Sequence, residues 1–360
     1  MNKTTSIPIV RSTEMSTKGE TDTIRIPAGM MNKAGLEVGD RLRVGADKIF
    51  FVAAALPGDN DKSTAFVSVI HEELVTASAK DITPLEVDVL TIGCDPEFVL
   101  LNKTTGAVVN ADHVFGGKGP LGSDAGLGEI RPAPHLDPAR VVENIRELMS
   151  AAKERTDSLA IGCSCYKGWT VGFHIHFGFP KSLLLQAAEN SREFIDNSIA
   201  ALDYLVGIPA MLRDTSDGRR GNGVYGKPGD FRISENTLEY RVPGGYHLRS
   251  PRYTAEMLTA AYCVIEDIVG RGHLISKHWS DMSRFFSGEH FSEVYNTPDK
   301  KNICRLLTNE DRTEAQKEIP KIKDIFASTI YGYGKNSQRI DSFLSCDSRE
   351  SPFIFDNWLT

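Results

Sequence analysis

Four times in this sequence, two functional side chains stand two residues apart in a strand-like stretch. The pairs are Asp95/Glu97, Glu129/Arg131, His174/His176 and Glu239/Arg241. Because residues i and i+2 of a strand point to the same face, four such strands in one sheet would gather carboxylates, imidazoles and guanidiniums on one surface. That much charge is costly to bury without ligands. The pattern predicts a site for a divalent metal ion and phosphate.

The His174/His176 pair lies in the apolar run VGFHIHFGF, so both imidazoles share one face. A single histidine in such a strand is more often a hydrogen-bonded core residue than a ligand, and an HxH pair can also mark zinc. Carboxylates outnumber the imidazoles here, and the close pair Cys163 and Cys165 is interpreted as core or loop thiols. Hard oxygen ligands favour Mg²⁺, with Mn²⁺ as the alternative.

Two further features bear on this site. Asp95-Pro96-Glu97 taken alone is more typical of a turn or a helix start, but the apolar runs VLTIG and FVLL around it favour a strand. The glycine-rich segment before Glu129 either cradles a substrate or forms a mobile loop. It lacks the Gly-Lys-Ser/Thr ending of a P-loop, and no GxGxxG opens a helix, so neither standard nucleotide fingerprint applies.

Residues 213–241 form the segment richest in basic side chains, on a glycine-rich background. Its simplest interpretation is a solvated charged loop. However, guanidinium groups make bidentate, charge-assisted hydrogen bonds to phosphoryl oxygens, and a pliable loop can close over a nucleotide. The basic residues are Arg213, Arg219, Arg220, Lys227, Arg232 and Arg241.

The composition is that of an ordinary globular protein. The chain has 360 residues, 41% hydrophobic residues and a formal charge of -7, which argues against nucleic acid as an obligatory partner of the whole chain. We find no apolar stretch of about 20 residues and no leader sequence, which predicts no membrane association and a cytoplasmic location, in the host cytoplasm if a phage encodes the protein. Six scattered cysteines fit a reducing compartment.

The elements that must position the charged pairs alternate with helical segments. Asp137-Pro138 reads as a helix start, and residues 141–149 carry an apolar stripe of helical period. Further helices are predicted over 181–213 and 253–270, the second ending at Gly270-Arg271-Gly272. These patterns predict an α+β fold, a curved sheet backed by helices.

The N-terminal region has a different character. Residues 1–20 are polar and predicted as a flexible tail with at most one short strand. Residues 21–86 are predicted as a small β-rich domain with strands from Thr23, over 41–44, 48–54 and 64–70. The segment with Ile26-Pro27, Gly35-Leu36 and Gly39-Asp40 resembles the AbrB/SpoVT swapped-hairpin family. The resemblance implies a dimer, hence a homo-oligomer, and DNA as a possible partner. Dimerisation or substrate docking is the simpler interpretation in this acidic chain.

Residues 87–360 are predicted as the second domain. Five of its motifs, in order, resemble the phage-type carboxylate–amine ligases (COOH-NH2 ligase, amidoligase type 2) of the glutamine synthetase/glutamate–cysteine ligase superfamily. The motifs are Asp95–Phe98, Glu129–Pro132, Gly172–Gly178, Arg220 with Tyr225-Gly226, and Leu238–Pro243. The resemblance covers about residues 90–250 and implies a mainly antiparallel sheet of glutamine synthetase type.

The resemblance also implies ATP- and Mg²⁺-dependent ligation of a carboxylate to an amine through an acyl phosphate. It implies five metal ligands: Asp95, Glu97, Glu129, His174 and Glu239. It implies nucleotide contacts from His176, Arg220, Tyr225, Lys227 and Arg241. Catalytic roles fall to Arg220, Arg232 and Arg241, which would stabilise phosphoryl charge, and to Arg131, which would receive the acceptor carboxylate, with Arg219 as the alternative match to Arg220.

Two other functions remain open from the sequence. One is a guanidino-kinase-like phosphotransferase on the same fold, and the other is a DNA-binding regulator with an inactive ligase body. Retention of every charged motif residue argues against an inactive site, because nothing else would keep this charge buried. The sequence does not name the substrates, which range from small molecules and peptides to a modified nucleobase.

Overall fold

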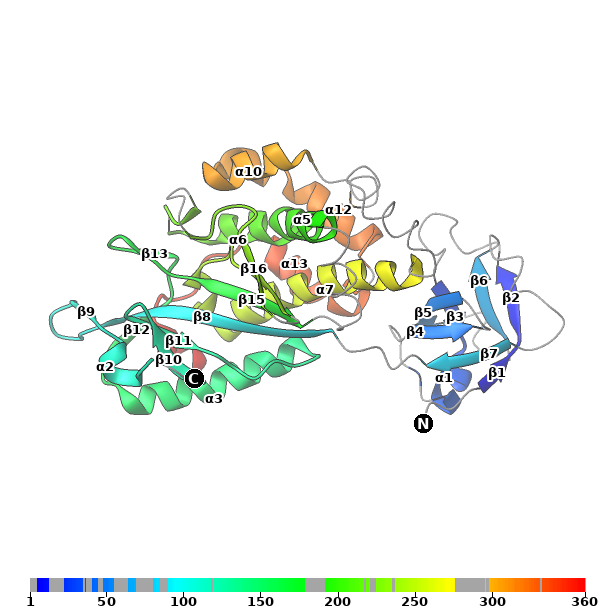
Figure 1. The fold of residues 1–360 in the computed structure, drawn as a ribbon, viewed down its shortest axis with the longest axis horizontal. Coiled ribbons are helices and arrows are strands. Elements are labelled where there is room, and N and C mark those ends of the chain that lie inside the picture. The colour runs from blue at the N-terminus through cyan, green and yellow to red at the C-terminus, as the bar shows by residue number, and fades with distance from the viewer. Residues whose placement is uncertain are drawn as a thin grey trace. The chain divides into compact units, whose positions relative to one another are not determined.

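The structure is a computed structural model. It describes residues 5–12, 23–34, 36, 41–44, 48–54, 64–68, 80–84, 90–117, 119–178, 192–216, 218–220, 225–234, 237–275, 295, 298–330 and 332–359 (Figure 1). The chain divides into two compact units. The first comprises Met1–Val87 and Val269–Phe285, and the second comprises Asp88–Ile268 and Phe286–Thr360.

The first unit contains a mixed seven-stranded sheet in the order β1-β7-β4-β5-β3-β6-β2. Its pairs β2·β6 and β3·β5 are parallel, and the other pairs are antiparallel. The elements are β1 (Thr5–Ile7), β2 (Ile9–Ser12), β3 (Thr23–Ile26), α1 (Ala28–Ala34), β4 (Arg41–Val44), β5 (Lys48–Ala54), β6 (Ala65–Ser68) and β7 (Lys80–Pro84).

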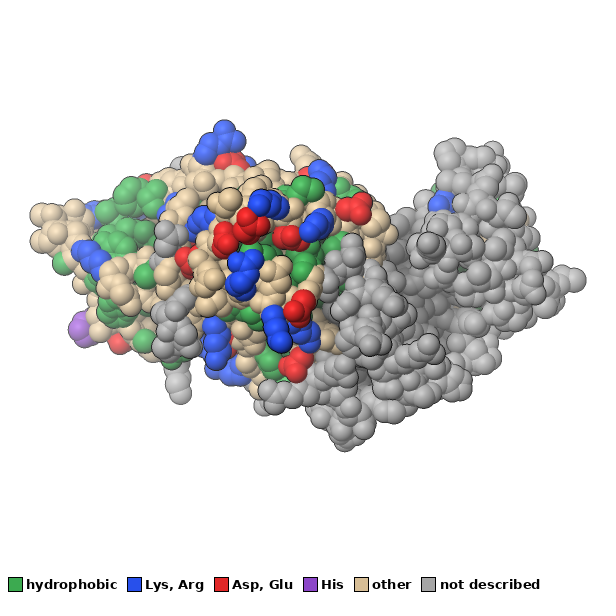
Figure 2. All heavy atoms as spheres, turned by 90° about the horizontal axis from the view of Figure 1, so that it is seen from above, with side chains coloured by type: hydrophobic (Ala, Val, Ile, Leu, Met, Phe, Trp, Pro, Cys, Tyr) green, Lys and Arg blue, Asp and Glu red, His purple; other side chains and the backbone are tan. Residues whose placement is uncertain are grey.

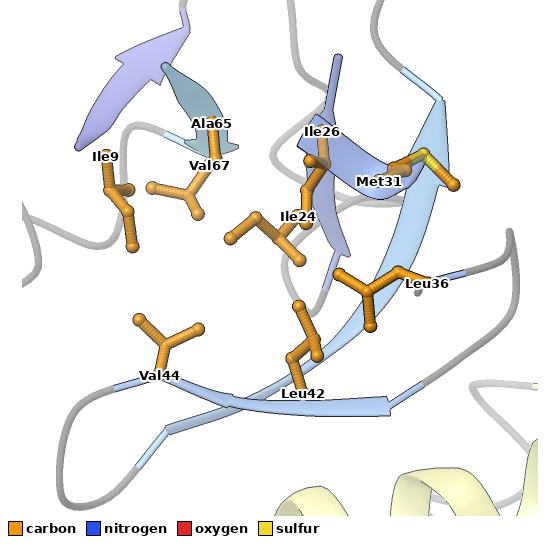
Figure 3. Packing of buried hydrophobic residues seen from close by; sticks show 9 residues of the cluster. All are labelled: Ile9, Ile24, Ile26, Met31, Leu36, Leu42, Val44, Ala65 and Val67. Carbon is orange, nitrogen blue, oxygen red and sulfur yellow. The ribbon is translucent and has the colours of Figure 1, made fainter. Parts of the chain in front are cut away.

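A small apolar cluster holds this unit together. Figure 3 shows its side chains converging from β2, β3, β4, β6 and α1 on a common centre. The members are Ile9, Ile24, Ile26, Met31, Leu36, Leu42, Val44, Ala65 and Val67. The predicted AbrB/SpoVT identity of this unit, with dimerisation or DNA binding, stays a prediction.

Within residues 1–20, the described residues 5–12 form two strands, where the sequence predicts a flexible tail with at most one short strand. They contain β1, which pairs with β7, and β2, which pairs with β6 at the opposite edge of the sheet. The short apolar run Ile7-Pro8-Ile9-Val10 explains the difference, because Ile9 is buried in the cluster. Burial of a few apolar residues outweighs the polar composition around them.

The second unit is built on an antiparallel sheet in the order β10-β11-β8-β15-β17-β16, to which β9 and β12 add by pairing with β8. This antiparallel sheet with its helices confirms the predicted α+β class. The strands are β8 (Thr91–Leu101), β9 (Val108–Val109), β10 (Leu121–Asp124), β11 (Leu127–Ile130), β12 (Leu159–Ile161), β15 (Phe173–Gly178), β16 (Phe231–Ser234) and β17 (Thr237–Tyr240). A separate hairpin joins β13 (Cys165–Tyr166) to β14 (Trp169–Thr170).

Helices lie on both sides of the β8–β15 pair in the view of Figure 1, with α3 on one side and α5, α6 and α10 on the other. The helical elements are α2 (Asp112–Phe115), α3 (Pro138–Arg155), α5 (Arg192–Leu202), the π-helical turn η3 (Asp203–Gly207), α6 (Ile208–Arg213), η5 (Gly245–Arg249), α7 (Pro251–Ile275), α10 (Lys300–Thr308), α11 (Arg312–Gln316), α12 (Ile319–Ser328), α13 (Tyr333–Leu344) and α14 (Ile354–Trp358).

The predicted helix start at Asp137 is confirmed, because its side chain accepts a hydrogen bond from the Ala139 amide and Pro138 occupies the first turn of α3. The predicted helix over 181–213 is confirmed from Arg192 onward, and residues 179–191 lie outside the described residues. The predicted end at Gly270–Gly272 is wrong, since α7 continues to Ile275. A glycine inside a helix costs only about 1 kcal/mol, which packing overrides.

One helical segment in the described part of the chain, Ile195–Arg213, is long and apolar enough to cross a membrane. It is 83% buried within the protein, as a core helix would be. On the face of the second unit seen in Figure 2, basic and acidic side chains are interspersed. The described residues of that face therefore form no extended patch of a single charge.

Candidate metal and phosphate site

The register of the sheet places the predicted pairs on one face. Glu129 of β11 lies opposite Glu97 of β8, and Asp95 of β8 lies opposite His174 of β15. The antiparallel ladders therefore carry the alternation of each strand into its neighbour without a shift of face. This charged face is the one that the i, i+2 spacing predicts.

The same face continues across the next two strands. His176 of β15 pairs with Glu239 of β17, and Glu239 pairs with Arg232 of β16. On the other side of His176 the partner is Gly93, and Pro134 packs over that glycine. One row of the sheet thus runs from an imidazole to a carboxylate to a guanidinium.

The opposite face is apolar and explains why these strands form. Ile175, Phe177 and Tyr240 alternate with the charged residues and are fully buried. Removal of such side chains from water is the main favourable contribution to folding. It holds the charged residues in position.

Three ligand atoms converge near the middle of the charged face. One ligand atom from each of Asp95, His176 and Glu239 lies within 4.8 Å of the other two, and His176 Nε2 is 3.1 Å from Asp95 Oδ1. Asp95 Oδ1, His176 Nε2 and Glu239 Oε1 are buried and form no hydrogen bond of good geometry among the described residues. Their contacts are ion pairs, between Asp95 and His176 and between Glu239 and Arg241. Buried polar atoms without hydrogen bonds are rare in proteins. Two carboxylate oxygens and one imidazole nitrogen fit a hard divalent cation such as Mg²⁺ or Mn²⁺.

His174 lies beside this cluster. Its Nδ1 is 3.2 Å from Asp95 Oδ1 and 3.5 Å from Glu239 Oε1. Burial alone would raise the pKa of Asp95, but the contacts of His174 and His176 outweigh it and hold that pKa well below its usual range. Asp95 is therefore a carboxylate throughout the neutral range, the form that binds cations.

Glu97, also predicted as a metal ligand, has different surroundings. Its Oε2 accepts a hydrogen bond of 2.5 Å from the Gly172 amide. Burial raises the pKa of Glu97, while His174, the Gly172 amide and Arg219 oppose the rise. A Cβ at Gly172 would lie 2.6 Å from His174 Nε2, so only glycine fits between the two side chains.

Glu129 and Arg131 form an ion pair at the edge of the charged face. Arg131 Nη1 also donates to the Gly119 carbonyl over 3.0 Å, which ties it to the glycine-rich loop. A Cβ at Gly122 would lie 2.6 Å from Arg131 Nη1. The glycine at 122 therefore gives the guanidinium its space.

Two predicted arginines contact Glu239 directly. Arg232 Nε lies 2.5 Å from Glu239 Oε2, and Arg241 Nε lies 3.2 Å from Glu239 Oε1. The guanidinium of Arg241 stacks over the Tyr225 ring at 5.5 Å. Both arginines thus present positive charge beside the metal-ligand cluster.

The adjacent arginines 219 and 220 point in different directions. Arg220, the one predicted to act, is fully buried and lies 3.8 Å from Asp214 and 3.7 Å from Glu310. Arg219 lines the cavity above the charged face, and burial lowers its pKa to about 10. The structure therefore brings Arg219, and not Arg220, to the site.

The side chain of Arg219 is held by the backbone. Its Nη2 donates to the Arg241 carbonyl over 3.1 Å, and a Cβ at Gly226 would lie 2.6 Å from its Nε. Gly226 has φ +70°, which favours glycine. Lys227, one residue further, is exposed and does not line the cavity.

The cavity over the charged face has a volume of about 620 Å³. Predicted residues that line it are Glu97, His174, Tyr225, Arg232 and Arg241, and Arg219 joins them. The turns of the β10–β11 and β13–β14 hairpins supply the remaining wall, including Asp124 and Trp169. The sequence interpretation offered the glycine-rich segment that contains Asp124 as a substrate cradle but missed Trp169. The dipeptides Ala125-Gly126 and Lys167-Gly168 were the available signals, because glycine in a two-residue loop is typical of hairpins.

Comparison with known proteins gives one family. The model of the family described as Phage phiEco32-like COOH.NH2 ligase-type 2 matches residues 92–325. No curated protein matches the sequence. The matched range contains every predicted residue of the charged face.

Two solved structures are similar to the chain at low identity. A bifunctional glutathione synthetase from Pasteurella multocida is 12% identical with a TM-score of 0.37, and the match covers 72% of this chain and 53% of that one. The complex between the prokaryotic ubiquitin-like protein Pup and its ligase PafA matches at 10% identity with a TM-score of 0.36, covering 74% of this chain and 66% of that one. The chain thus spans about half the length of the first and just under two thirds of the second. At these scores the two similarities support no further argument.

Proposed function

The chain belongs to the Phage phiEco32-like COOH.NH2 ligase-type 2 family, and on this basis we propose that it joins a carboxylate to an amine with ATP as the energy source. The observation that carries the proposal is the cluster of Asp95, His176 and Glu239 with Arg232 and Arg241 beside it on one face. Buried ligand atoms without hydrogen bonds of good geometry, next to guanidiniums, suit a metal–triphosphate complex.

The proposed reaction has two steps. In the first, a carboxylate oxygen attacks the γ-phosphorus, the bond from that phosphorus to the bridging oxygen breaks, and ADP leaves. In the second, an unprotonated amine attacks the carbonyl carbon of the acyl phosphate, the carbon–oxygen bond to phosphate breaks, and phosphate leaves. The nitrogen loses one further proton as the amide forms.

Asp95, His176 and Glu239 would hold Mg²⁺, or Mn²⁺ in its place. The bound ion would supply neutralisation of the charge on the triphosphate. His174 would orient the two carboxylates through its Nδ1 contacts. Glu97 and Glu129, which are predicted ligands, are engaged by the Gly172 amide and Arg131 and would contribute to a second ion at most.

Three arginines would bind the phosphoryl oxygens. Arg219 and Arg241 line the cavity and are linked through the Arg241 carbonyl. Arg232 is mostly exposed, so its side chain can turn from Glu239 towards a phosphate. Arg131, tied to the Gly119 carbonyl, would receive the carboxylate substrate together with the glycine-rich loop.

The test is ADP release with Mg²⁺ across pools of carboxylates and amines, with mass spectrometry of the products. We expect a product lighter by one water than its two substrates combined, and a loss of about 100-fold in rate for Glu239→Gln. Glu147→Gln, an exposed glutamate of α3, is the matched control and should behave as wild type. A phosphorylated substrate as the final product would instead indicate a guanidino-kinase-like phosphotransferase.

A further inference from the structure

The cavity has a second wall, made by two tight hairpin turns. Ala125 and Gly126 join β10 to β11 with φ of 47° and 84°, and Lys167 and Gly168 join β13 to β14 with φ of 47° and 88°. Positive φ at both central residues is the geometry of a type I′ turn, the rigid two-residue connection of hairpins. This wall therefore has little freedom to rearrange.

The two turns are packed against each other through Trp169. A Cβ at Gly126 would lie 3.2 Å from Trp169 Cη2, so the indole ring rests on the glycine backbone. The indole of Trp169 is still 37% exposed, and it lines the cavity together with Asp124. An aromatic side chain kept partly exposed on a rigid support is suited to bind a ligand.

One side chain of this wall, the carboxylate of Asp124, is opposite in charge to the arginines of the phosphate side. The carboxylate of Asp124 is exposed, and no ion pair joins it to a basic side chain of the described residues. The same wall also contains Lys167, whose ammonium lies 5.4 Å from the Tyr166 ring centre.

We infer that Asp124 and Trp169 form the subsite of the amine substrate, which binds as an ammonium cation before it loses its proton. The carboxylate accepts charge-assisted hydrogen bonds from the ammonium, and the indole face attracts the cation. This inference rests on the proposed function and names the substrate class of one side of the cavity, a cationic primary amine.

The chemistry requires such a division of the cavity. In the second step the amine approaches the acyl carbon while the phosphate departs from it, so the two groups need separate places. Arg219, Arg232 and Arg241 attract the anionic phosphate, and Asp124 attracts a cation. The cavity thus offers a place for each.

The test separates the amine from ATP. Hydroxylamine at high concentration is used first in place of the amine, because it reacts with acyl phosphates without having to bind as a cation. If wild type releases no ADP with hydroxylamine, the proposed function itself is refuted. With wild type active, the KM for a primary amine should rise about tenfold or more in Asp124→Asn. The KM for ATP should change less than about twofold in the same variant.

Two variants of Trp169 give an independent comparison. Trp169→Leu removes the aromatic face and should raise the KM for the amine about fivefold. Trp169→Phe keeps an aromatic ring, so its KM for the amine should lie between those of wild type and Trp169→Leu. Asp157→Asn, an exposed aspartate outside the cavity, is the matched control for Asp124→Asn. An increase confined to the KM for ATP would overturn the inference and assign the wall to the nucleotide base.

A binding measurement keeps the inference testable without turnover. Tetramethylammonium carries the charge of an ammonium but cannot form an amide. Its binding should change the tryptophan fluorescence emission of wild type more than that of Trp169→Leu. Equal responses of the two proteins to tetramethylammonium would overturn the inference.

Discussion

On the charged face of the β8–β15–β17 sheet, polar atoms are buried without hydrogen-bond partners, whereas on the opposite face the same strands bury apolar side chains completely. His176 and Glu239 belong to the first face, and Ile175, Phe177 and Tyr240 to the second. Burial of apolar surface stabilises the fold, and burial of charged groups opposes it. The difference teaches that one face supplies the stability and the other retains the binding capacity.

The pKa shifts of two buried carboxyl groups also differ, one on the charged face and one that contacts Tyr240 of the apolar face. Asp95 on the charged face is held ionised by His174 and His176. Asp203 of η3 is buried, and its oxygens accept hydrogen bonds from Tyr240 Oη at 2.9 Å and from the Gly229 amide at 2.7 Å. Burial raises the pKa of Asp203 to about 7. The pKa of each carboxyl group thus follows from its own surroundings.

The largest expected effect comes from the apolar face. Phe177→Ala should lower the free energy of unfolding by about 3–5 kcal/mol, because a fully buried ring leaves a cavity. Urea unfolding of the purified protein measures it. Ile175→Val, which removes one methylene from the same face, should cost only about 1 kcal/mol and serves as the graded control. Equal costs for the two variants would contradict the claim that burial here stabilises in proportion to volume.

The next effect is a pH dependence due to Asp203. Between pH about 4 and about 7 the folded state keeps a proton on Asp203 that the unfolded chain has lost, so the free energy of unfolding falls as pH rises through this window and levels off above it. The slope from this group is at most about 1.4 kcal/mol per pH unit. Urea unfolding at several pH values, for wild type and Asp203→Asn, isolates the contribution.

In Asp203→Asn this part of the slope should vanish, since the amide does not titrate. Asp196, on α5, provides the comparison as Asp196→Asn, which should keep the slope of wild type. A slope that survives unchanged in Asp203→Asn would show that another group is responsible.

The smallest effect lies on neither face. Asp137→Ala removes the cap of α3 and should lower the free energy of unfolding by about 1 kcal/mol. Because Asp137 does not line the cavity, ADP release should keep the rate of wild type. A loss of activity larger than the loss of folded protein would contradict the claim that Asp137 affects stability and not binding.

Much of the charged face could be predicted from local pattern. The i, i+2 spacing gives the face of each side chain, and the apolar residues between them give the strand, so the common face of Asp95, His176 and Glu239 follows from periodicity. The ligand set does not, because the resemblance implies His174 as the metal ligand and His176 as a nucleotide contact, whereas the cluster contains His176. The strand bounds Arg41–Val44 and Lys48–Ala54 follow likewise from alternation and turn residues.

Other features depend on contacts between distant residues. Which of Arg219 and Arg220 reaches the cavity depends on Asp214 and Glu310, whose carboxylates neutralise Arg220. The wall of Asp124 and Trp169 depends on two hairpins whose turns are 42 residues apart in the sequence and meet at Gly126. The strands in residues 1–20 depend on partners at 65–68 and 80–82. Periodicity carries no information about such pairings.

The central claim is that the charged face holds a divalent cation for ATP, and binding of Mn²⁺ tests it most directly. Mn²⁺ followed by electron paramagnetic resonance, with a non-hydrolysable ATP analogue present, should bind wild type and Glu147→Gln alike. Its affinity should fall at least about tenfold in Glu239→Gln and in Asp95→Asn. Equal Mn²⁺ affinity in all four proteins would contradict the account.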